Sequence, residues 1–347
     1  MDVVLIPAYE PDEQLIPLVQ QLTENDLTVL VVDDGSGKDY WPIFDQVRES
    51  AMVLTQQING GKGAALKTGM QYIWDHMPEC EHVITCDADG QHTVKDVLRV
   101  QHTLHAGNSF VLSVRTPQKE VKVPLRSKVG NTLSRVVYTL LTNRYLPDNQ
   151  SGLRGFARDH IDWMRQVEKN NYDYEMNVLY YAAKKGLQIT MLPIETIYIN
   201  DNASSHFNPI KDTLRIYKSL FWLARSSFFA LLASEIGVIV ASFLGGRFSN
   251  ESLWITLPLI GAGSLVVNTA LSQFWVFRKI RCADHMGNLI YTIFVYFLYT
   301  MGCILLRYMM PWMPLWLAFN IMLIAALPIR YFFHKCLHLV GNSLHRT

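Results

Sequence analysis

The sequence predicts an α/β domain followed by an all-α membrane domain. Between residues 1 and 200, short apolar runs alternate with helical patterns, as in domains built on a mostly parallel sheet. These runs are apolar at consecutive positions, which favours strands covered on both faces. After Phe228 long apolar stretches dominate, and the 347 residues reach a hydrophobic content of 50% and a mean hydropathy of +0.11. This hydrophobic content is high for a soluble protein, and its uneven distribution favours two domains of different kinds.

Five strands are expected in the first domain. The apolar runs place them at Val3–Ile6, Thr28–Val32, Met52–Thr55, His82–Cys86 and Ser109–Val114. Helical spacing of apolar residues places the intervening helices at Glu13–Asn25, Tyr40–Glu49, Gly63–Trp74 and Val94–His105. Strands joined through helices in this way form parallel βαβ units.

Polar loops follow three of these strands. They are Pro7-Ala8-Tyr9-Glu10, Asp33-Asp34-Gly35-Ser36 and Asp87-Ala88-Asp89. In open α/β sheets, ligands bind beyond the carboxyl ends of the strands. We therefore expect the three loops to meet at one rim and to form a ligand site there.

The acidic loop Asp87-Ala88-Asp89-Gly90-Gln91 carries the strongest chemical signal. It places two carboxylates one residue apart, directly after a buried strand. A hard divalent cation that bridges two phosphates takes such oxygen ligands and keeps positions open for the phosphates. Because an isolated Asp-x-Asp pair is also typical of a solvated turn, the interpretation depends on the neighbouring loops.

The loop Gly60-Gly61-Lys62-Gly63 opens a predicted helix with a lysine suited to a diphosphate. It is not a Walker A loop, because Gly63 stands where Ser or Thr follows the lysine in that motif. No Gly-x-Gly-x-x-Gly dinucleotide fingerprint occurs in the sequence. A P-loop kinase and a nicotinamide-dependent dehydrogenase therefore lack their minimal motifs here.

Taken in order, these motifs resemble those of the family 2 glycosyltransferases with a GT-A fold. The resemblance is to the polyprenyl-phosphate glycosyltransferases, such as dolichyl-phosphate mannose synthase and bacterial undecaprenyl-phosphate glucosyltransferases. The matching segments are Ile6–Glu10, Val32–Ser36, Asn59–Gly63, Asp87–Gln91, Asp148–Gly155 and the Tyr174-Glu175 pair. The resemblance spans roughly residues 1–225 and implies a Rossmann-like, nucleotide-sugar-binding domain at 1–209.

The resemblance also implies a role for each matched residue. The donor nucleotide would contact Pro7, Ala8, Tyr9, Glu10, Asp33, Asp34, Lys62, Asp87 and Ala88. Mg²⁺ or Mn²⁺ would be held on the donor diphosphate by Asp87, Asp89 and Gln91. The implied catalytic residues are Asp89, Arg115, Arg126 and Glu175, and those near the acceptor phosphate are Arg154, Ser205, His206, Lys211 and Arg215.

Several of these residues have a second interpretation. Each arginine also fits an ordinary ion pair, and His206 fits a solvent-facing loop residue. Glu175 also fits a first-turn acid stabilised by the helix dipole. Tyr9 and Pro11 stand where the family often has Asn and Glu, so the nucleobase of the donor stays open.

Residues 210–226 predict an amphipathic helix at a membrane surface. Apolar residues recur at helical spacing on one side: Ile210, Leu214, Tyr217, Phe221 and Ala224. An adjoining basic stripe suits an anionic surface: Lys211, Arg215, Lys218 and Arg225. The same pattern also fits a solvated helix face in a globular domain.

Four transmembrane helices are expected next, at about 227–245, 253–276, 289–310 and 313–333, each long enough for a hydrocarbon core of about 30 Å. Basic residues gather at the ends assigned to the inside, and only Arg247 and Arg307 lie at the outer ends, so both termini are expected in the cytoplasm. Residues 227–347 resemble the GtrA-type membrane domain through the number of spans and the segment Gln273–Arg278. Glu235 within the first span is equally consistent with helix packing and with lipid handling.

Charge and cysteine content exclude other classes. The net charge of +1, without a basic patch interleaved with aromatic residues, argues against a nucleic-acid partner. The five cysteines stand at unrelated spacings, which predicts reduced thiols and no cysteine metal site. No signal peptide precedes the first strand, so the first domain is expected in the cytoplasm.

The resemblance implies an inverting, metal-dependent transfer of a hexose from a nucleotide diphosphate sugar, with a UDP-sugar favoured, to a polyprenyl phosphate. The reaction is expected at the cytoplasmic face of the cell membrane, for glycosylation of the cell envelope. Two alternatives are a GDP-mannose-dependent dolichyl-phosphate mannose synthase and a glycolipid flippase with a subsidiary transferase domain. Any of these is compatible with an oligomer.

Overall fold

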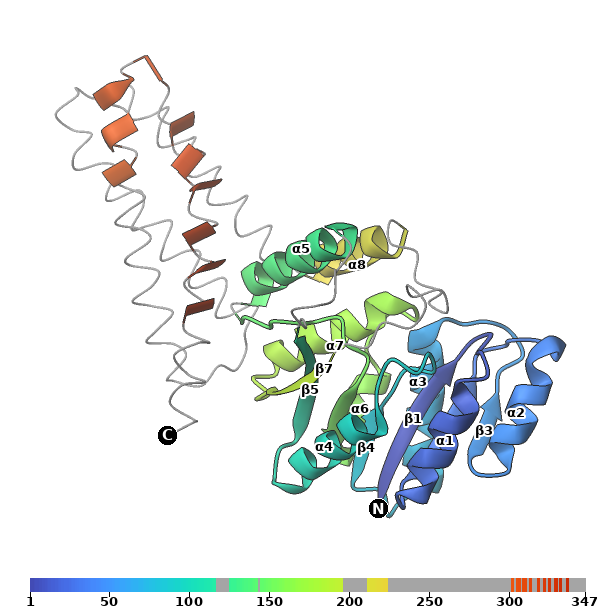
Figure 1. The fold of residues 1–347 in the computed structure, drawn as a ribbon. Coiled ribbons are helices and arrows are strands. Elements are labelled where there is room, and N and C mark those ends of the chain that lie inside the picture. Colours follow the sequence, from blue (N-terminus) through green and yellow to red (C-terminus); the bar gives the residue numbers. More distant parts are fainter. Residues whose placement is uncertain are drawn as a thin grey trace. The chain divides into compact units, whose positions relative to one another are not determined.

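The structure, a computed structural model, describes residues 1–116, 125–142, 144–195 and 211–223, with scattered positions between 301 and 336. The chain divides into two compact units. The first unit contains Met1–Ser134, Pro147–Ala182 and Leu187–Leu220, and it carries the sheet (Figure 1). The second unit contains Arg135–Leu146, Ala183–Gly186 and Phe221–Thr347.

The described elements follow an α/β order. The strands are β1 (Asp2–Ala8), β2 (Thr28–Asp33), β3 (Met52–Thr55), β4 (His82–Thr85), β5 (Phe110–Thr116), β6 (Arg154–Ala157) and β7 (Thr190–Glu195). The α-helices are α1 (Leu15–Glu24), α2 (Trp41–Arg48), α3 (Lys62–His76), α4 (Val94–His105), α5 (Leu125–Thr142), α6 (Ile161–Arg165), α7 (Tyr172–Lys184) and α8 (Lys211–Leu223). Two short 3-10 helices precede α2 and α6, η1 (Lys38–Tyr40) and η2 (Arg158–His160).

The strands form one sheet in the order β3-β2-β1-β4-β6-β5-β7. Strand β6 runs antiparallel to both of its neighbours, β4 and β5, and the other pairings are parallel. The expectation of a mostly parallel sheet is therefore confirmed. The carboxyl ends of β1, β2 and β4 lie side by side, because Ala8 pairs with Asp33 and Leu5 pairs with Thr85.

The five expected strands and four expected helices all occur, with ends shifted by two residues or fewer. Strand β3 and helix α4 have the expected bounds. Strands β6 and β7 were not expected as strands. β6 has only four residues, and β7 contains Pro193, which its place at the edge of the sheet tolerates because an edge strand leaves some N–H groups unpaired.

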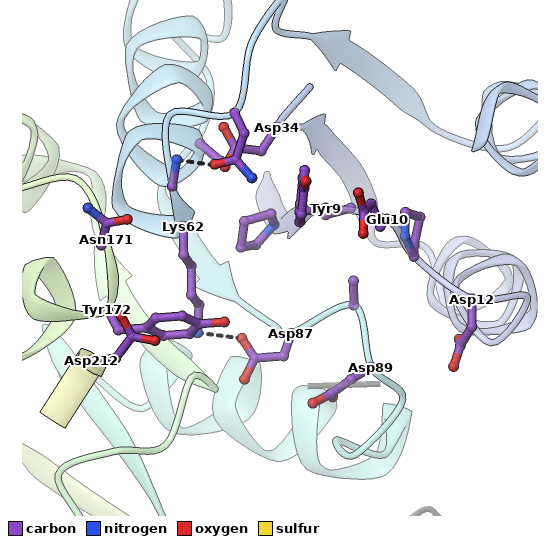
Figure 2. A pocket seen from close by; sticks show the side chains of 17 residues that line it. Tyr9, Glu10, Asp12, Asp34, Lys62, Asp87, Asp89, Asn171, Tyr172 and Asp212 are labelled. Carbon is purple, nitrogen blue, oxygen red and sulfur yellow. Dashed lines mark hydrogen bonds and ion pairs between the residues drawn. The ribbon is translucent and has the colours of Figure 1, made fainter. Parts of the chain in front are cut away.

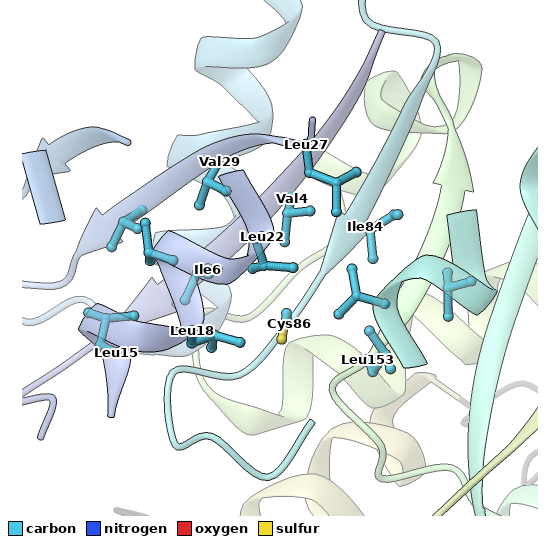
Figure 3. Close-up of a cluster of buried hydrophobic side chains, with 14 of the residues drawn as sticks. Val4, Ile6, Leu15, Leu18, Leu22, Leu27, Val29, Ile84, Cys86 and Leu153 are labelled. Carbon is cyan, nitrogen blue, oxygen red and sulfur yellow. The ribbon is translucent and has the colours of Figure 1, made fainter. Parts of the chain in front are cut away.

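The core lies on both faces of the sheet, as continuous apolar strands require. Helices α1, α2 and α4 cover one face, where their buried side chains meet Val4 and Ile6 of β1 (Figure 3). Helix α3 covers the other face, and Gly69 brings it so close to Leu5 that a methyl group at Gly69 would overlap the leucine. Each fully buried Leu or Val stabilises the fold by about 1.5–3 kcal/mol relative to exposure. This double cover holds the strand ends, and the loops that follow them, in place.

Helix α8 is the part of the expected interfacial segment that the structure describes. Ile216, Ser219 and Leu220 are buried, and Ser219 exchanges hydrogen bonds with the side chain of Asn177 on α7. Leu214 and Trp222 are exposed. One side of α8 therefore packs on the first unit as far as Leu220, and exposed apolar residues remain elsewhere on the helix.

The expected transmembrane helices lie outside the described residues, except for scattered positions after residue 300. Glu235 and the segment 273–278 also lie outside them. Within the described residues, no helix combines the length and the hydropathy needed to cross a membrane. Of the cysteines, the described Cys80, Cys86 and Cys336 are free thiols.

Candidate active site

A cavity of about 420 Å³ opens at the carboxyl ends of β1, β2 and β4. Its lining includes all three loops that the sequence placed at this rim (Figure 2). The lining residues from these loops are Pro7, Ala8, Tyr9, Glu10, Pro11, Asp12, Asp34, Asp87, Ala88 and Asp89. The remaining ones come from the start of α3 and its preceding loop, from the start of α7 and its preceding loop, and from α8: Asn59, Gly61, Lys62, Ala65, Asn171, Tyr172 and Asp212.

The two carboxylates that end β2 have different positions. Asp34 lines the cavity, and its two carboxylate oxygens accept hydrogen bonds from the backbone N–H groups of Gly60 and Gly61, at 2.9 and 2.8 Å. Burial raises the pKa of Asp34, and these two hydrogen bonds oppose the shift. Asp33 is buried and accepts a hydrogen bond from the backbone N–H of Ser36 at 2.9 Å, so it stabilises the turn and is not among the lining residues.

Gly35 makes this turn possible. Its φ of +74° lies in the left-handed region that favours glycine, and a Cβ there would overlap the backbone of Ile58. The loop after β2 and the loop before α3 therefore touch, with the Asp34 carboxylate joining them.

Lys62, the first residue of α3, lies between two acids. Its Nζ is 2.6 Å from Oδ1 of Asp87 and 2.8 Å from Oε2 of Glu175, and its side chain is 16% exposed. Burial alone would lower the pKa of Lys62, but the charges of Asp87 and Glu175 outweigh it and raise the pKa above its ordinary value. Lys62 is therefore a fixed positive charge on the cavity wall, and Figure 2 shows its side chain directed at Asp87.

The acidic loop is arranged asymmetrically. Burial would raise the pKa of Asp87, but the Lys62 ammonium and the nearby His92 hold it far below its ordinary value. The pKa of Asp89 is raised by burial and then by the negative charge of Asp87. Asp89 accepts a hydrogen bond from the backbone N–H of Gln91 at 3.1 Å. Asp87 is thus paired with a lysine, whereas Asp89 is held by the backbone of Gln91 and lies close enough to Asp87 for the two carboxylates to repel each other.

This donor set fits a hard divalent cation. Asp87 and Asp89 are carboxylates, both line the cavity, and the raised pKa of Asp89 marks a position where added positive charge would be favourable. Lys62 already forms an ion pair with one oxygen of Asp87. A cation would therefore share this carboxylate with the lysine or displace the lysine from it. Within the described residues, Asp87, Asp89 and His92 do not converge closely enough to form a preassembled group of three ligands.

The segment Asp148–Gly155 forms the inner support of the site. Gly152 lies against Asp87 so closely that a methyl group would overlap the carboxylate. The Gly152 carbonyl accepts a hydrogen bond from the Thr85 hydroxyl at 2.8 Å, which fixes the segment to the end of β4. The requirement for glycine at 152 is therefore steric.

Arg154 is a positioning residue in this structure. Its side chain is 4% exposed, and it donates to the Ser151 carbonyl at 2.9 Å and to the Glu175 carbonyl at 2.7 Å. The third guanidinium nitrogen lies 3.8 Å from the Glu175 carboxylate. Arg154 is buried among these partners and is not among the lining residues of the cavity, so its contact with an acceptor phosphate stays a prediction.

Arg115 and Asp148 form a two-point ion pair. Arg115 Nε lies 2.6 Å from Oδ2 of Asp148, and a second nitrogen lies 3.1 Å from Oδ1. Burial would raise the pKa of Asp148, but the guanidinium holds it below its ordinary value. The ion-pair interpretation of Arg115 therefore describes the structure, and the arginine is not among the lining residues.

The other expected site residues divide into two groups. Glu175 lies in the first turn of α7 and contacts Lys62, and Arg215 of α8 pairs with the lining residue Asp212 at 3.2 Å. Ser205 and His206 lie outside the described residues. Arg126 belongs to α5 and Lys211 begins α8, but their side chains also lie outside the described part.

Four residues at the site were not expected from the sequence. Asn171 and Tyr172 line the cavity just before the Tyr174-Glu175 pair, which was the only local signal for them. Tyr172 has a pKa raised to about 12, first by burial, and Lys62 lies 5.8 Å from its ring centroid. Asp212 and His92 became visible only through tertiary contacts, with the cavity and with Asp87 respectively.

Comparison with known proteins identifies the family. The family described as glycosyl transferase family 2 matches residues 3–162. An uncharacterized protein of Methanocaldococcus jannaschii is 30% identical over 231 residues, which cover 65% of this chain and 92% of that protein. The chain belongs to glycosyl transferase family 2.

This family 2 glycosyltransferase also resembles a protein with an assigned reaction. The UDP-N-acetylglucosamine–dolichyl-phosphate N-acetylglucosaminyltransferase of Methanococcus voltae is 27% identical over 215 residues, which cover 56% of this chain and 85% of that enzyme. Among solved structures, a mycobacterial protein gives a TM-score of 0.50 at 18% identity, over 64% of this chain and 74% of that one. The latter likeness concerns the fold alone, which is the expected GT-A, Rossmann-like sheet.

Proposed function

We propose that this glycosyltransferase moves a hexose from a nucleotide diphosphate sugar to the phosphate of a polyprenyl phosphate, with inversion at the anomeric carbon. The observation that carries the proposal is the cavity at the sheet rim, where Asp34, Lys62, Asp87 and Asp89 converge. The assigned reaction of the Methanococcus voltae relative, which uses a UDP-sugar and dolichyl phosphate, supports the same class of donor and acceptor.

The cavity has the parts that a donor needs. Pro7, Ala8, Tyr9 and Asp34 line the cavity together, and the backbone N–H of Asp34 donates to the Ala8 carbonyl at 2.8 Å. The Asp34 carboxylate would accept hydrogen bonds from a ribose or a base. Lys62 supplies positive charge for the diphosphate. Its acid partners hold it in place, so the charge does not have to be reorganised when the donor arrives.

Asp87 and Asp89 would hold Mg²⁺ or Mn²⁺, with Gln91 from the same loop. Bound there, the cation would neutralise the diphosphate and stabilise the departing nucleoside diphosphate. Lys62, which contacts Asp87, would neutralise the same diphosphate. The cation and Lys62 would stabilise the transition state, in which negative charge builds up on the leaving diphosphate, more than the ground state.

The acceptor requires little base catalysis. A phosphate monoester has a second pKa near 6, so its attacking oxygen is largely ionised at pH 7. The chemical demand is to bring two anionic groups together. Because acids outnumber Lys62 among the lining residues, a bound divalent cation would supply most of the positive charge that this requires. Glu175, which is already engaged with Lys62, is assigned to holding the lysine and not to taking a proton.

A lipid acceptor would also require the enzyme to work at a membrane surface. Helix α8 borders the cavity through Asp212 and carries exposed Leu214, Lys218 and Trp222, a composition suited to a lipid headgroup surface. We propose that the segment after α8 anchors the enzyme in the cell membrane through helices at 227–347, with the catalytic domain in the cytoplasm.

A donor panel tests the proposal. Purified full-length protein in nanodiscs with Mn²⁺ and undecaprenyl phosphate is given radiolabelled UDP-glucose, UDP-N-acetylglucosamine, UDP-galactose or GDP-mannose in parallel reactions. One productive donor, with label in the organic phase and loss of transfer on EDTA addition, is the expected result. Transfer from GDP-mannose alone would replace the UDP-sugar by the GDP-mannose alternative. Absence of both transfer and nucleotide binding would overturn the proposal.

A further inference from the structure

Three potential metal ligands converge at the amino ends of β1 and β4, opposite the strand ends that form the candidate active site. Asp2 begins β1, His82 begins β4 and His105 ends α4. Asp2 Oδ1 lies 2.9 Å from Nδ1 of His82, and Asp2 Oδ2 lies 2.7 Å from Nε2 of His105. The two imidazole rings have centroids 5.3 Å apart.

The fold itself brings these side chains together. Asp2 and His82 are directly paired in the parallel register of β1 and β4, so their side chains leave the sheet on the same face. Helix α4 lies against β4 and contributes His105 in its last turn and Gln101 one turn earlier, and the Gln101 amide contacts Asp2 Oδ2 at 2.7 Å. Three elements distant in sequence thus supply one cluster.

The donor atoms suit a transition-metal ion. Each residue offers one nitrogen or oxygen, and these atoms all lie within 4.8 Å of one another. In a tetrahedral zinc site with bonds of about 2.0–2.1 Å, the ligand atoms stand about 3.3 Å apart. The nitrogens that face Asp2 are therefore already oriented inward, and small side-chain rotations bring the three atoms to the required spacing.

The surroundings also fit such an ion. Asp2 has a side chain 5% exposed, whereas His105 is 53% exposed and leaves a route to solvent. Two imidazoles and one carboxylate favour zinc, nickel or copper over Mg²⁺, which prefers oxygen ligands alone. Gln101 holds the Asp2 carboxylate from outside, as second partners of metal ligands usually do.

We propose that Asp2, His82 and His105 form a zinc-class metal site that ties helix α4 to the amino ends of β1 and β4, with a fourth position open to water. The site shares no residue with the candidate active site. Within the described residues, no other three His, Cys, Asp or Glu side chains come together in this way.

The test is zinc binding by untagged full-length protein that has been treated with a chelator. Titration with ZnCl₂ is followed by calorimetry, and Co²⁺ is added in parallel to read the coordination from its visible spectrum. His82→Ala and His105→Ala remove ligands, and circular dichroism checks that each variant is folded. His102→Ala is the matched control, because His102 is exposed on the same helix outside the cluster.

The expected result is one tightly bound equivalent of zinc, apart from binding at Asp87 and Asp89, whose affinity falls by more than about tenfold in His82→Ala and in His105→Ala. His102→Ala and Asp89→Asn retain it, which separates this site from the sheet rim. Zinc should also raise the unfolding temperature of the wild type more than that of His105→Ala, because an ion that binds only the folded state stabilises it. Unchanged zinc binding in both ligand variants, or an equal loss in His102→Ala, would mean a hydrogen-bonded cluster only and would overturn the proposal.

Discussion

At the residue scale, the candidate site depends on the short distances between the Asp87 carboxylate and its neighbours. Lys62 approaches one oxygen of this carboxylate at 2.6 Å, His92 lies 3.6 Å from the other, and Gly152 packs against the carboxylate, whose side chain stays 26% exposed and lines the cavity. A carboxylate enclosed in this way has a defined direction, which preorganises the charges around the donor diphosphate. Small changes at this point should therefore have large effects on activity.

Gly152→Ala should impair transfer without unfolding the protein. The added methyl group overlaps the Asp87 carboxylate and forces it to rotate away from Lys62. We expect transfer to fall by about 10²-fold or more, as small displacements of catalytic groups do. Gly130→Ala is the control, because nothing lies within 4 Å of a Cβ at that helical position. Near-normal transfer by Gly152→Ala in the presence of folded protein would contradict this account.

Lys62→Met should separate two roles of the lysine. Removal of the ammonium frees Asp87, so affinity for Mn²⁺ in the absence of nucleotide should rise, whereas affinity for a nucleoside diphosphate should fall by about tenfold or more. Both affinities are measured by calorimetry, with Lys38→Met at an exposed position as the control. Unchanged Mn²⁺ affinity would show that the lysine and the cation do not compete for Asp87.

At the element scale, the sequence predicted the first five strands and their order along the chain, but it did not predict the contacts between distant elements. β1, β2 and β4 are continuous apolar runs that end in polar loops, so the rim followed from the rule that parallel strands present their carboxyl ends together. β6 has four residues, including Arg154 and Gly155, and such a segment shows no period. Its antiparallel insertion between β4 and β5 depends on tertiary packing.

The role of Arg154 shows the same limit. Guanidinium groups suit phosphate, so its motif alone favoured an acceptor contact. The structure places its main partner, Glu175, 21 residues further along the chain on α7. A sequence pattern shows which side chains are suited to a ligand, but burial decides whether they reach it.

The Arg115–Asp148 pair, which joins β5 to the loop before β6, should give a pH-dependent stability. The pKa of Asp148 is lowered in the folded state, below the unfolded value of about 3.9. Its contribution is therefore fully present above about pH 5 and is lost as the pH falls through the folded-state pKa. Asp148→Asn should reduce the free energy of unfolding at pH 7 by about 1–3 kcal/mol.

The measurement is urea unfolding of wild type and Asp148→Asn between pH 7 and pH 3. The difference in free energy of unfolding should stay constant from pH 7 to about pH 5 and shrink below it, because the unfolded wild-type chain then takes up a proton at Asp148 that the folded ion pair excludes. A difference that is independent of pH across this range would contradict the assigned pKa shift.

At the scale of the whole molecule, the proposed reaction combines a water-soluble donor with a lipid acceptor. The GT-A domain would bind the donor, and under the proposed function the exposed Leu214 and Trp222 of α8 would contact a lipid surface. The full-length protein should therefore remain with membranes after extraction with alkaline carbonate, which removes proteins held by charge alone. Quantitative release into the supernatant would contradict the anchoring at 227–347.

The most direct measurement of the central claim compares acceptors in one reaction. Full-length protein with its productive donor and Mn²⁺ is given undecaprenyl phosphate or undecaprenol, and Asp89→Ala is run beside the wild type with Asp39→Ala as an exposed control. The account predicts labelled lipid only with the phosphate, in the wild type and in Asp39→Ala, and none in Asp89→Ala. Equal transfer to the alcohol, or a near-normal rate in Asp89→Ala, would contradict it.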